Sequence, residues 1–338
     1  MALPAFIGFR KGYTGAISPG PSRKAFTGNR DMNILLTGAS GQLGTELIPL
    51  LSGKGQLYVT DRSPPAHQVS NWMPLDVTDR VAVGQMLNDV QPGLVVNAAA
   101  YTAVDQAETE PDTSFAVNAE FPGQLAHWAK QHDALLIHYS TDYVFDGKGS
   151  SPYKESQTAA PQNVYGESKL GGEHAILSSG CRHSILRTSW VYSSHGKNFV
   201  LSMLNLARKG IALNVVDDQR GCPTWAGSLA RASDLLIGQW QTDARKDFNG
   251  LFHYCDDRSL SWYEFATAIF KQAVTKGLLD LMPALAPIPS SEFPQPATRP
   301  QWSVLNTEKI QRVFNLKCGS FDQSLKTVVD EISRERNL

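Results

Sequence analysis

Short apolar runs, most of them without polar alternation, recur along the chain and end in small or polar residues. They span residues 34–36, 56–60, 73–77, 93–97, 134–140 and 182–188. Apolar strands without alternation are typical of a parallel sheet that helices cover on both faces. These runs therefore predict the strands of one buried sheet.

Apolar residues at helical spacing lie between and after these runs. The predicted helices span residues 81–90, 111–132, 166–177, 198–207, 226–240 and 261–271. Strands that alternate with helices predict an α/β fold, a doubly wound parallel sheet of the Rossmann type with a smaller C-terminal substrate-binding lobe.

The order of elements changes along the chain and suggests two parts. We expect residues 32–190 to be mainly a dinucleotide-binding domain. Residues 191–338 should be mainly the substrate-binding lobe, with some chain returning to the sheet. The proline-rich segment 284–300 predicts a rigid surface loop.

Residues 1–31 differ from the rest: Gly, Pro, Ser and basic residues are frequent, and no strand or helix pattern is present. A targeting peptide is one interpretation. We favour a disordered or spurious N-terminal extension, because Met32 stands directly before the first predicted strand.

Composition excludes several classes of function. With 31 Lys and Arg against 32 Asp and Glu in 338 residues, the chain lacks the basic excess of a nucleic-acid binder. No apolar run approaches the ~20 residues of a membrane span. The four cysteines lie far apart without a C-x-x-C pair, so we expect no metal site and no disulfide framework. Reduced thiols predict a cytoplasmic protein.

Three glycines, Gly38, Gly41 and Gly44, follow the first predicted strand at intervals of three residues. Such glycines permit a tight turn, let backbone N–H groups approach a pyrophosphate and let a helix pack close to its strand. Asp61 ends the second strand about 20 residues later, where a dinucleotide fold places the acid that binds the adenosine ribose. The spacing predicts a bound dinucleotide.

Further residues complete the expected cofactor site. They are Ser40, Gln42 and Leu43 in the glycine loop, Arg62 beside Asp61, Asp76 and Val77 after the third strand, and Ala98, Ala99 and Ala100 after the fourth. Small residues past the carboxyl end of a strand let a ligand lie against the backbone. Asp76 either faces the adenine or forms a solvated turn.

Polar residues at the end of the fifth strand and on the next helix form a candidate catalytic group. Thr141 follows the strand, and Tyr165 and Lys169 are four residues apart on one face of the predicted helix. A Tyr/Lys pair alone is common on surface helices. Its position after a dinucleotide half favours a catalytic pair, whereas His138, inside the strand, is interpreted as a core histidine.

Taken together, the motifs resemble the extended short-chain dehydrogenases/reductases and, more narrowly, the dTDP-4-dehydrorhamnose reductases. The motifs are Thr37-Gly-Ala-Ser-Gly-Gln-Leu-Gly44, Asn97-Ala-Ala-Ala-Tyr-Thr-Ala-Val-Asp105, Ser140-Thr-Asp-Tyr-Val-Phe-Asp146, Asn163-Val-Tyr-Gly166 with Lys169, Arg187-Thr-Ser-Trp-Val-Tyr192, Asp218-Gln-Arg-Gly-Cys-Pro-Thr224 and Thr298-Arg-Pro300. The resemblance covers the chain from about residue 32 to its end.

The resemblance implies reduction of the C4 ketone of dTDP-4-dehydro-L-rhamnose to dTDP-L-rhamnose by NADPH or NADH. Tyr165 would donate the proton, Thr141 would bind the reacting oxygen, and Lys169 would lower the pKa of the Tyr165 phenol and hold the nicotinamide ribose. The residues implied to face the sugar nucleotide are Tyr101, Thr102, Asp105, Tyr143, Trp190 and Arg299. For Arg299 a surface ion pair is nearly as good an interpretation, and for Trp190 a place in the core is equally good.

Other functions remain open at this point. A reductase-like regulatory subunit of methionine adenosyltransferase would bind a dinucleotide and a partner without turnover. An epimerase or dehydratase acting on another nucleotide sugar is a third hypothesis, although dehydratases usually carry an acid pair where this chain has only Asp142. The sequence does not decide whether Mg²⁺ is needed or whether the chain forms a homodimer.

Overall fold

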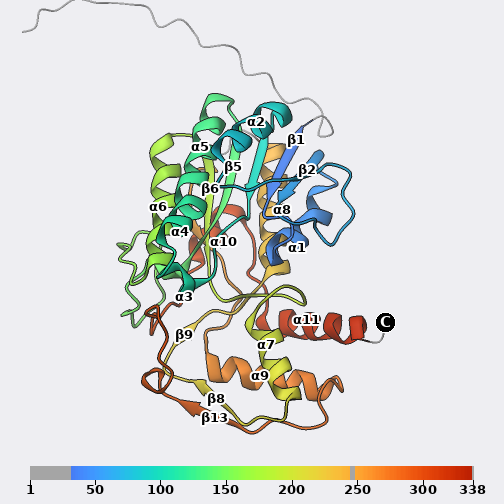
Figure 1. The fold of residues 1–338 in the computed structure, drawn as a ribbon, viewed down its shortest axis with the longest axis vertical. Coiled ribbons are helices and arrows are strands. Elements are labelled where there is room, and N and C mark those ends of the chain that lie inside the picture. Colours follow the sequence, from blue (N-terminus) through green and yellow to red (C-terminus); the bar gives the residue numbers. More distant parts are fainter. Residues whose placement is uncertain (1–31, 244–247, 337–338) are drawn as a thin grey trace, which may run out of the picture.

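A seven-stranded parallel sheet forms the centre of the larger lobe in the computed structural model (Figure 1), which describes residues 32–243 and 248–336. The expectation for residues 1–31 lies outside the described residues. In chain order the strands are β1 (Asn33–Thr37), β2 (Gln56–Asp61), β3 (Trp72–Pro74), β4 (Leu94–Asn97), β5 (Leu135–Thr141), β6 (Arg182–Thr188) and β11 (Gly250–His253). Their order across the sheet is β11-β6-β5-β4-β1-β2-β3. The predicted α/β fold with a doubly wound parallel sheet is confirmed.

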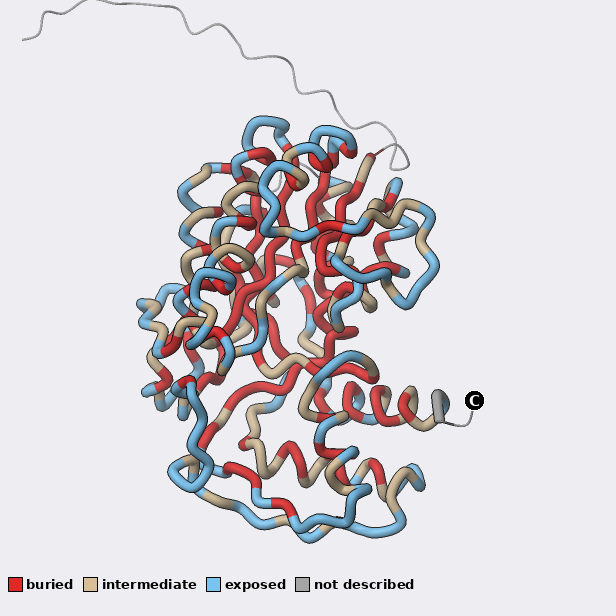
Figure 2. Tube along the Cα trace, in the orientation of Figure 1, coloured by how far each residue is buried: buried red, intermediate tan, exposed pale blue. Residues whose placement is uncertain are grey.

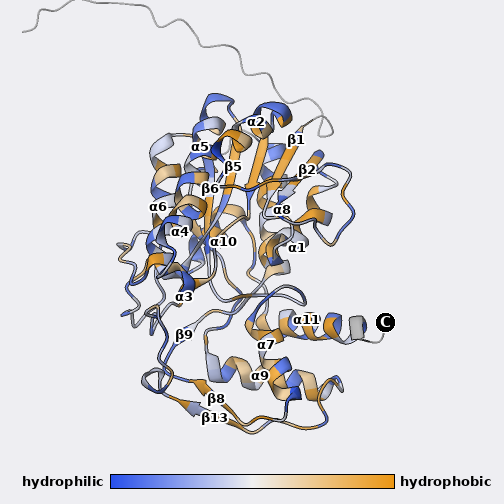
Figure 3. Ribbon diagram, viewed as in Figure 1, coloured by the Kyte–Doolittle hydropathy of each residue, from blue (hydrophilic) through white to orange (hydrophobic). Residues whose placement is uncertain are grey.

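Helices cover both faces of this sheet, which explains why its strands read as continuous apolar runs. Ile34 and Leu36 pack against α1 (Gln42–Leu51), α8 (Ala226–Thr242) and α10 (Glu308–Phe314). Leu35 points to the other face, which is covered by α2 (Arg80–Val90), α5 (Phe121–Gln131) and α6 (Val164–Ser179). Figure 2 shows the strands as the most buried part of this lobe, and Figure 3 shows that they are also its most hydrophobic part.

The helix predicted for residues 111–132 is interrupted by a wider turn. It consists of α4 (Pro111–Phe115), a π-helical segment (Ala116–Glu120) and α5. The short helix α3 (Val104–Ala107) precedes it. π-Helical turns inside α-helices are frequent at functional sites. Here the segment brings Asn118 into the interior, where its side chain is fully buried.

The smaller lobe has its own apolar core, built mainly by α7 (Phe199–Arg208), α9 (Trp262–Thr275) and α11 (Phe321–Arg336). Three two-stranded sheets complete it. They pair β7 (Val191–Tyr192) with β10 (Thr224–Trp225), β9 (Arg220–Gly221) with β12 (Leu260–Ser261), and β8 (Leu213–Val216) with β13 (Leu285–Ile288).

Part of the proline-rich segment is a strand, which differs from the expected surface loop. In β13, Pro287 lies opposite Val215 of β8. Proline has no N–H to donate, but an edge strand tolerates it because only one side must pair. The flanking hydrogen bonds, from Leu213 to the Ala284 carbonyl and from Asp217 to the Ile288 carbonyl, hold the pair together.

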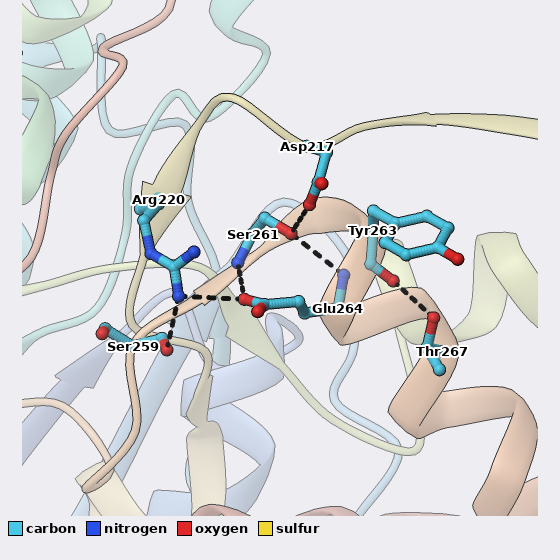
Figure 4. A network of polar contacts seen from close by, with 7 residues as sticks. All are labelled: Asp217, Arg220, Ser259, Ser261, Tyr263, Glu264 and Thr267. Carbon is cyan, nitrogen blue, oxygen red and sulfur yellow. Dashed lines mark hydrogen bonds and ion pairs between the residues drawn. The ribbon is translucent and has the colours of Figure 1, made fainter. Parts of the chain in front are cut away.

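Helix α9 starts at a polar network that joins it to the preceding loops (Figure 4). Ser261 and Glu264 form a capping box, in which each side chain binds the backbone N–H of the other residue. The Ser261 hydroxyl also donates to Asp217, and Arg220 lies 3.0 Å from the Glu264 carboxylate. Arg220, the first residue of β9, therefore joins that strand to the first turn of α9.

Candidate active site

The glycine loop between β1 and α1 is packed so tightly that larger residues would not fit. Gly38 has φ +72°, and an added Cβ would lie 2.5 Å from the Ala98 carbonyl carbon. At Gly44 an added Cβ would lie 2.1 Å from the Gly38 carbonyl oxygen. Gly41 is the N-cap of α1 and supplies no side chain to the first N–H groups of the helix. The loop thus offers backbone donors and the positive end of a helix to an anion, as a pyrophosphate requires.

A cavity of about 790 Å³ opens beside this loop. Most of the predicted cofactor residues line it: Gly38, Ser40, Gly41, Asp61, Arg62, Asp76, Val77, Ala98, Ala99 and Ala100. Two predicted substrate residues, Tyr101 and Thr102, also line it. Its size and lining fit a dinucleotide, since the added-Cβ contacts show that the backbone itself forms the cradle.

Asp61 and Ser40 fix one wall of this cavity. The Asp61 carboxylate accepts hydrogen bonds from both the backbone N–H and the hydroxyl of Ser40, at 3.0 and 2.7 Å. The neighbouring Arg62 side chain is exposed. Asp76 binds Thr78 through the Thr78 backbone N–H and hydroxyl, and these bonds lower the pKa of its carboxyl group. Asp76 thus forms the solvated turn that the sequence left as an alternative, on the rim of the same cavity.

Gln42, Leu43 and Gly44, also predicted to bind the cofactor, are not among the described residues that line the cavity. The Gln42 side chain instead accepts hydrogen bonds from Ser193 and Asn198, at 2.9 and 3.0 Å. It therefore joins the first turn of α1 to the loop that leads into the smaller lobe.

The candidate catalytic residues meet at the carboxyl edge of the sheet. Thr141 is the last residue of β5; its hydroxyl donates a 3.0 Å hydrogen bond to Asp142 and lies close enough to the Tyr165 hydroxyl of α6 to influence the pKa of that phenol. Burial raises the pKa of Tyr165 to about 12, while the Thr141 hydroxyl opposes that shift. The expected lowering of this pKa by Lys169 is not found: besides burial, the groups that shift it are Thr141 and Asp142. The phenol is therefore fully protonated at neutral pH.

Lys169 lies one helical turn beyond Tyr165 and is almost completely buried. Its Nζ donates a 2.7 Å hydrogen bond to the Tyr139 carbonyl and lies 3.5 Å from His138 Nε2. Burial lowers the pKa of Lys169 to about 8, and the charge of Glu173 opposes this shift. His138 is buried as expected, but it also contacts a candidate catalytic residue, which its place inside a strand did not indicate.

The residues predicted to bind the substrate do not form one group but make separate contacts with different partners. The rings of Tyr143 and Tyr165 meet edge to face, with centroids 5.6 Å apart. Arg299 pairs with Asp105 at 2.8 Å, so two residues expected to face the sugar nucleotide bind each other. The Tyr101 hydroxyl donates to Glu110 at 2.9 Å on the side of the cofactor cavity.

Trp190 is held in an unusual conformation directly before β7. Its φ is +48°, which bulky residues rarely adopt. Its ring stacks on Trp262, with centroids 3.5 Å apart, and a Cβ added at Gly221 would lie 2.4 Å from the ring. Both observations describe an aromatic side chain packed within the smaller lobe, in line with the core interpretation, although the residue stays half-buried.

Two groups of residues that support the site were missed from the sequence. Asn118 binds the backbone N–H and carbonyl of Tyr101 and also donates to Ser168 on α6, so it links the cofactor cavity to the catalytic helix. Nothing in the local sequence indicates the π-helical turn that places it there. Glu173 continues the spacing of Tyr165 and Lys169 by four more residues, a signal that could have identified it.

Glu173 forms a buried ion pair behind the candidate catalytic residues. Its carboxylate accepts two hydrogen bonds from Arg187, at 2.8 and 2.6 Å, and one from the Ser140 hydroxyl. The pair connects α6, β5 and β6 next to Thr141. Among the described residues, no group of three or more His, Cys, Asp or Glu side chains is placed to hold a metal ion.

Known proteins share both the sequence and this architecture. The family model for the RmlD substrate binding domain matches residues 32–334. The dTDP-4-dehydrorhamnose reductase of Escherichia coli (strain K12) is 38% identical over 301 residues, which cover 89% of this chain and 98% of that protein.

Two solved structures agree with this assignment. A dTDP-4-dehydrorhamnose reductase of Clostridium acetobutylicum is similar with a TM-score of 0.77 and 35% identity, over 89% of this chain and 99% of that one. The Bacillus anthracis enzyme, solved in complex with NADP, gives a TM-score of 0.77 and 31% identity over the same shares. The resemblance inferred from the motifs is thereby confirmed: the chain belongs to the dTDP-4-dehydrorhamnose reductase family.

Proposed function

We propose that this protein reduces the C4 ketone of dTDP-4-dehydro-L-rhamnose to give dTDP-L-rhamnose, with NADPH or NADH as the hydride source, as a cytoplasmic enzyme. The observation that carries the proposal is that the hydroxyls of Tyr165 and Thr141 lie together at the carboxyl edge of the sheet. Open α/β sheets bind their ligands at this edge. The family's named activity supports the same reaction.

The chain's own residues account for the proton that the reaction needs. A bound reduced nicotinamide would supply the hydride. Reduction of a ketone leaves a developing alkoxide, which Tyr165 would meet as a general acid because its raised pKa keeps the phenol protonated. Thr141 would hydrogen-bond the same oxygen and fix its distance from Tyr165.

The glycine loop, Asp61 and Lys169 would bind the dinucleotide. Gly38 and Gly44 leave no room for a side chain, so the bare backbone of the loop can approach a pyrophosphate. Asp61 is already held by Ser40 and presents its carboxylate to the cavity, where a ribose hydroxyl would meet it. The buried amino group of Lys169 would hold the nicotinamide ribose.

The remaining predicted residues would bind the sugar nucleotide. Tyr143 lies against the Tyr165 ring, so it would face the deoxysugar. Arg299 carries the charge that a diphosphate needs, and a sugar nucleotide would have to draw it from Asp105. Tyr101, Thr102 and Trp190 would complete the walls, with Trp190 contributing at most the edge of a ring already stacked on Trp262.

The direct test combines purified protein with NADPH and dTDP-4-dehydro-L-rhamnose and follows the loss of reduced-nicotinamide absorbance. Mass spectrometry should find a product two mass units heavier than the substrate. A protein that binds NADPH tightly but shows no turnover would instead favour the regulatory-subunit hypothesis. Turnover with other 4-keto sugar nucleotides at equal kcat/KM would contradict the assigned substrate.

A further inference from the structure

Four buried polar residues form a continuous chain from the glycine loop to Lys169. The Thr37 hydroxyl at the end of β1 donates to Asn97 Oδ1 of β4 at 2.7 Å. Asn97 Nδ2 lies 3.0 Å from His138 Nδ1 of β5, and His138 Nε2 lies 3.5 Å from Lys169 Nζ of α6. None of the four residues is more than 2% exposed. Water therefore does not set the orientation of these groups, and each must be satisfied by the next.

The chain fixes which imidazole nitrogen carries the proton. Because Thr37 donates to the amide oxygen of Asn97, the amide nitrogen faces His138 Nδ1, and an amide nitrogen can only donate. Nδ1 must then accept. Burial and the charge of Lys169 lower the pKa of His138 well below its usual value, so the imidazole is neutral. A neutral imidazole carries one proton, which must lie on Nε2, directed at Lys169.

We propose that Thr37 and Asn97 hold His138 as the Nε2–H tautomer, and that His138 is a positioning residue which directs this hydrogen at Lys169 Nζ and favours the uncharged amine of the lysine. The inference rests on the proposed function for its meaning in catalysis. It gives Lys169 a partner, His138, on strand β5. In the described contacts, His138 touches neither the cavity nor Tyr165.

The other groups around Lys169 are consistent with this role. The Tyr139 carbonyl accepts a hydrogen bond from either the ammonium or the amine. Glu173 favours the ammonium, but its carboxylate is engaged by Arg187 and Ser140. Burial favours the amine and brings the pKa of Lys169 to about 8. A lysine poised in this way exchanges a proton near neutral pH, which suits a group that restores the proton that Tyr165 gives to the substrate oxygen.

The tautomer can be observed without substrate. Protein labelled with ¹⁵N-histidine would give long-range ¹H–¹⁵N spectra of the imidazoles, in which the protonated nitrogen is identified directly. The chain has eight histidines, so His138→Gln would identify the signal. We expect the Nε2–H tautomer in the wild type. An Nδ1–H tautomer would overturn the proposal, whether or not any variant folds.

A matched pair of threonine variants tests the chain itself. Thr37→Val removes the donor to Asn97, frees the amide to turn, and should populate the Nδ1–H tautomer; Thr37→Ser keeps a hydroxyl and should restore the wild-type spectrum. Thr60→Val is the control, because Thr60 lies beside Thr37 in the sheet and its buried hydroxyl has no hydrogen-bond partner among the described residues. Equal spectra for Thr37→Val and the wild type would contradict the proposed chain.

Activity gives a second readout. Because Lys169 must be protonated to restore the proton to Tyr165, Thr37→Val should move the alkaline limb of kcat upward by about 0.5 pH unit or more, since Nε2 can then accept from the ammonium. Thr60→Val should leave the limb unchanged. A downward shift or none for Thr37→Val would overturn the proposal. The correct tautomer in a protein without turnover would contradict the proposed function alone.

Discussion

The guanidinium of Arg299 lies 2.8 Å from the carboxylate of Asp105, although 194 positions separate them in the chain. Asp105 also accepts a hydrogen bond from the backbone N–H of Ala297, at 3.2 Å. The carboxylate thus fixes both the side chain of Arg299 and the segment that carries it. An arginine presented in this way, 14% exposed, is preorganised but partly accessible.

Arg299→Met should raise the KM for the sugar nucleotide at least about tenfold if Arg299 binds the diphosphate, because a charge-assisted contact is lost. The melting temperature should change little, since a partly exposed ion pair contributes about 0–1 kcal/mol. Steady-state kinetics beside thermal unfolding separates the two interpretations. An unchanged KM would mean that Arg299 serves only as an ion-pair partner of Asp105.

The Glu173–Arg187 pair should matter mainly for stability. Glu173→Gln leaves the buried Arg187 without its charged partner and should lower the free energy of unfolding by about 3–5 kcal/mol. Glu120→Gln is a control, because Glu120 and Arg80 are 3.9 Å apart, with side chains 59% and 72% exposed. That change should cost under about 1 kcal/mol. If chemical denaturation gave the same loss of unfolding free energy for Glu173→Gln and Glu120→Gln, the buried pair would contribute no more to stability than the exposed one.

The Asp142 carboxyl should make stability depend on pH. Burial raises the pKa of Asp142 to about 7, above the value of 3.8 expected in the unfolded chain. Between these values the folded protein binds the proton more tightly, so the contribution of Asp142 to stability should be largest below about pH 4 and fall as pH rises towards 7. Asp142→Asn has no such group and should reduce the fall.

The measurement compares unfolding free energies of the wild type and Asp142→Asn at several values between pH 4.5 and 7.5. The difference should change by up to about 1.4 kcal/mol for each pH unit crossed. Other carboxylates titrate in both proteins and cancel in the difference. A difference that stays constant with pH would show that the Asp142 carboxyl is not shifted.

The preference of the protein between NADH and NADPH should be weak. Asp61 would bind a ribose 2′-hydroxyl and repel a 2′-phosphate, while the exposed Arg62 beside it can neutralise that phosphate. We expect kcat/KM for NADH and NADPH to agree within about a hundredfold, or 2.7 kcal/mol. Arg62→Leu should lower the value for NADPH about tenfold and leave NADH unaffected. A stronger preference in the wild type would contradict this balance.

The sequence patterns predicted those features that depend on residues close together in the chain. The glycine loop and Asp61 were predictable because turn geometry and strand ends depend on neighbouring residues. The contacts of the Gln42 side chain were not predictable, because its partners Ser193 and Asn198 lie more than 150 positions away in the chain. His138 was identified as buried, yet its contact with Lys169 depends on how α6 packs on β5.

The substrate residues show the same limit. Trp190 looked equally suited to the core and to the sugar, and only the position of Trp262 shows that its ring is already stacked. The expected influence of Lys169 on the pKa of Tyr165 followed from spacing, but spacing does not measure burial. In the folded protein, desolvation is the largest influence on the pKa of both Tyr165 and Lys169.

The most direct test of the account is Tyr165→Phe, measured as kcat beside the dissociation constant for NADPH. The change removes one hydroxyl, keeps the ring against Tyr143, and deletes the proposed proton donor. We predict that kcat falls by about 10²- to 10⁴-fold, the usual contribution of a positioned general acid, while NADPH affinity stays within about threefold. Wild-type turnover in a folded Tyr165→Phe protein would contradict the assignment of Tyr165 as the acid.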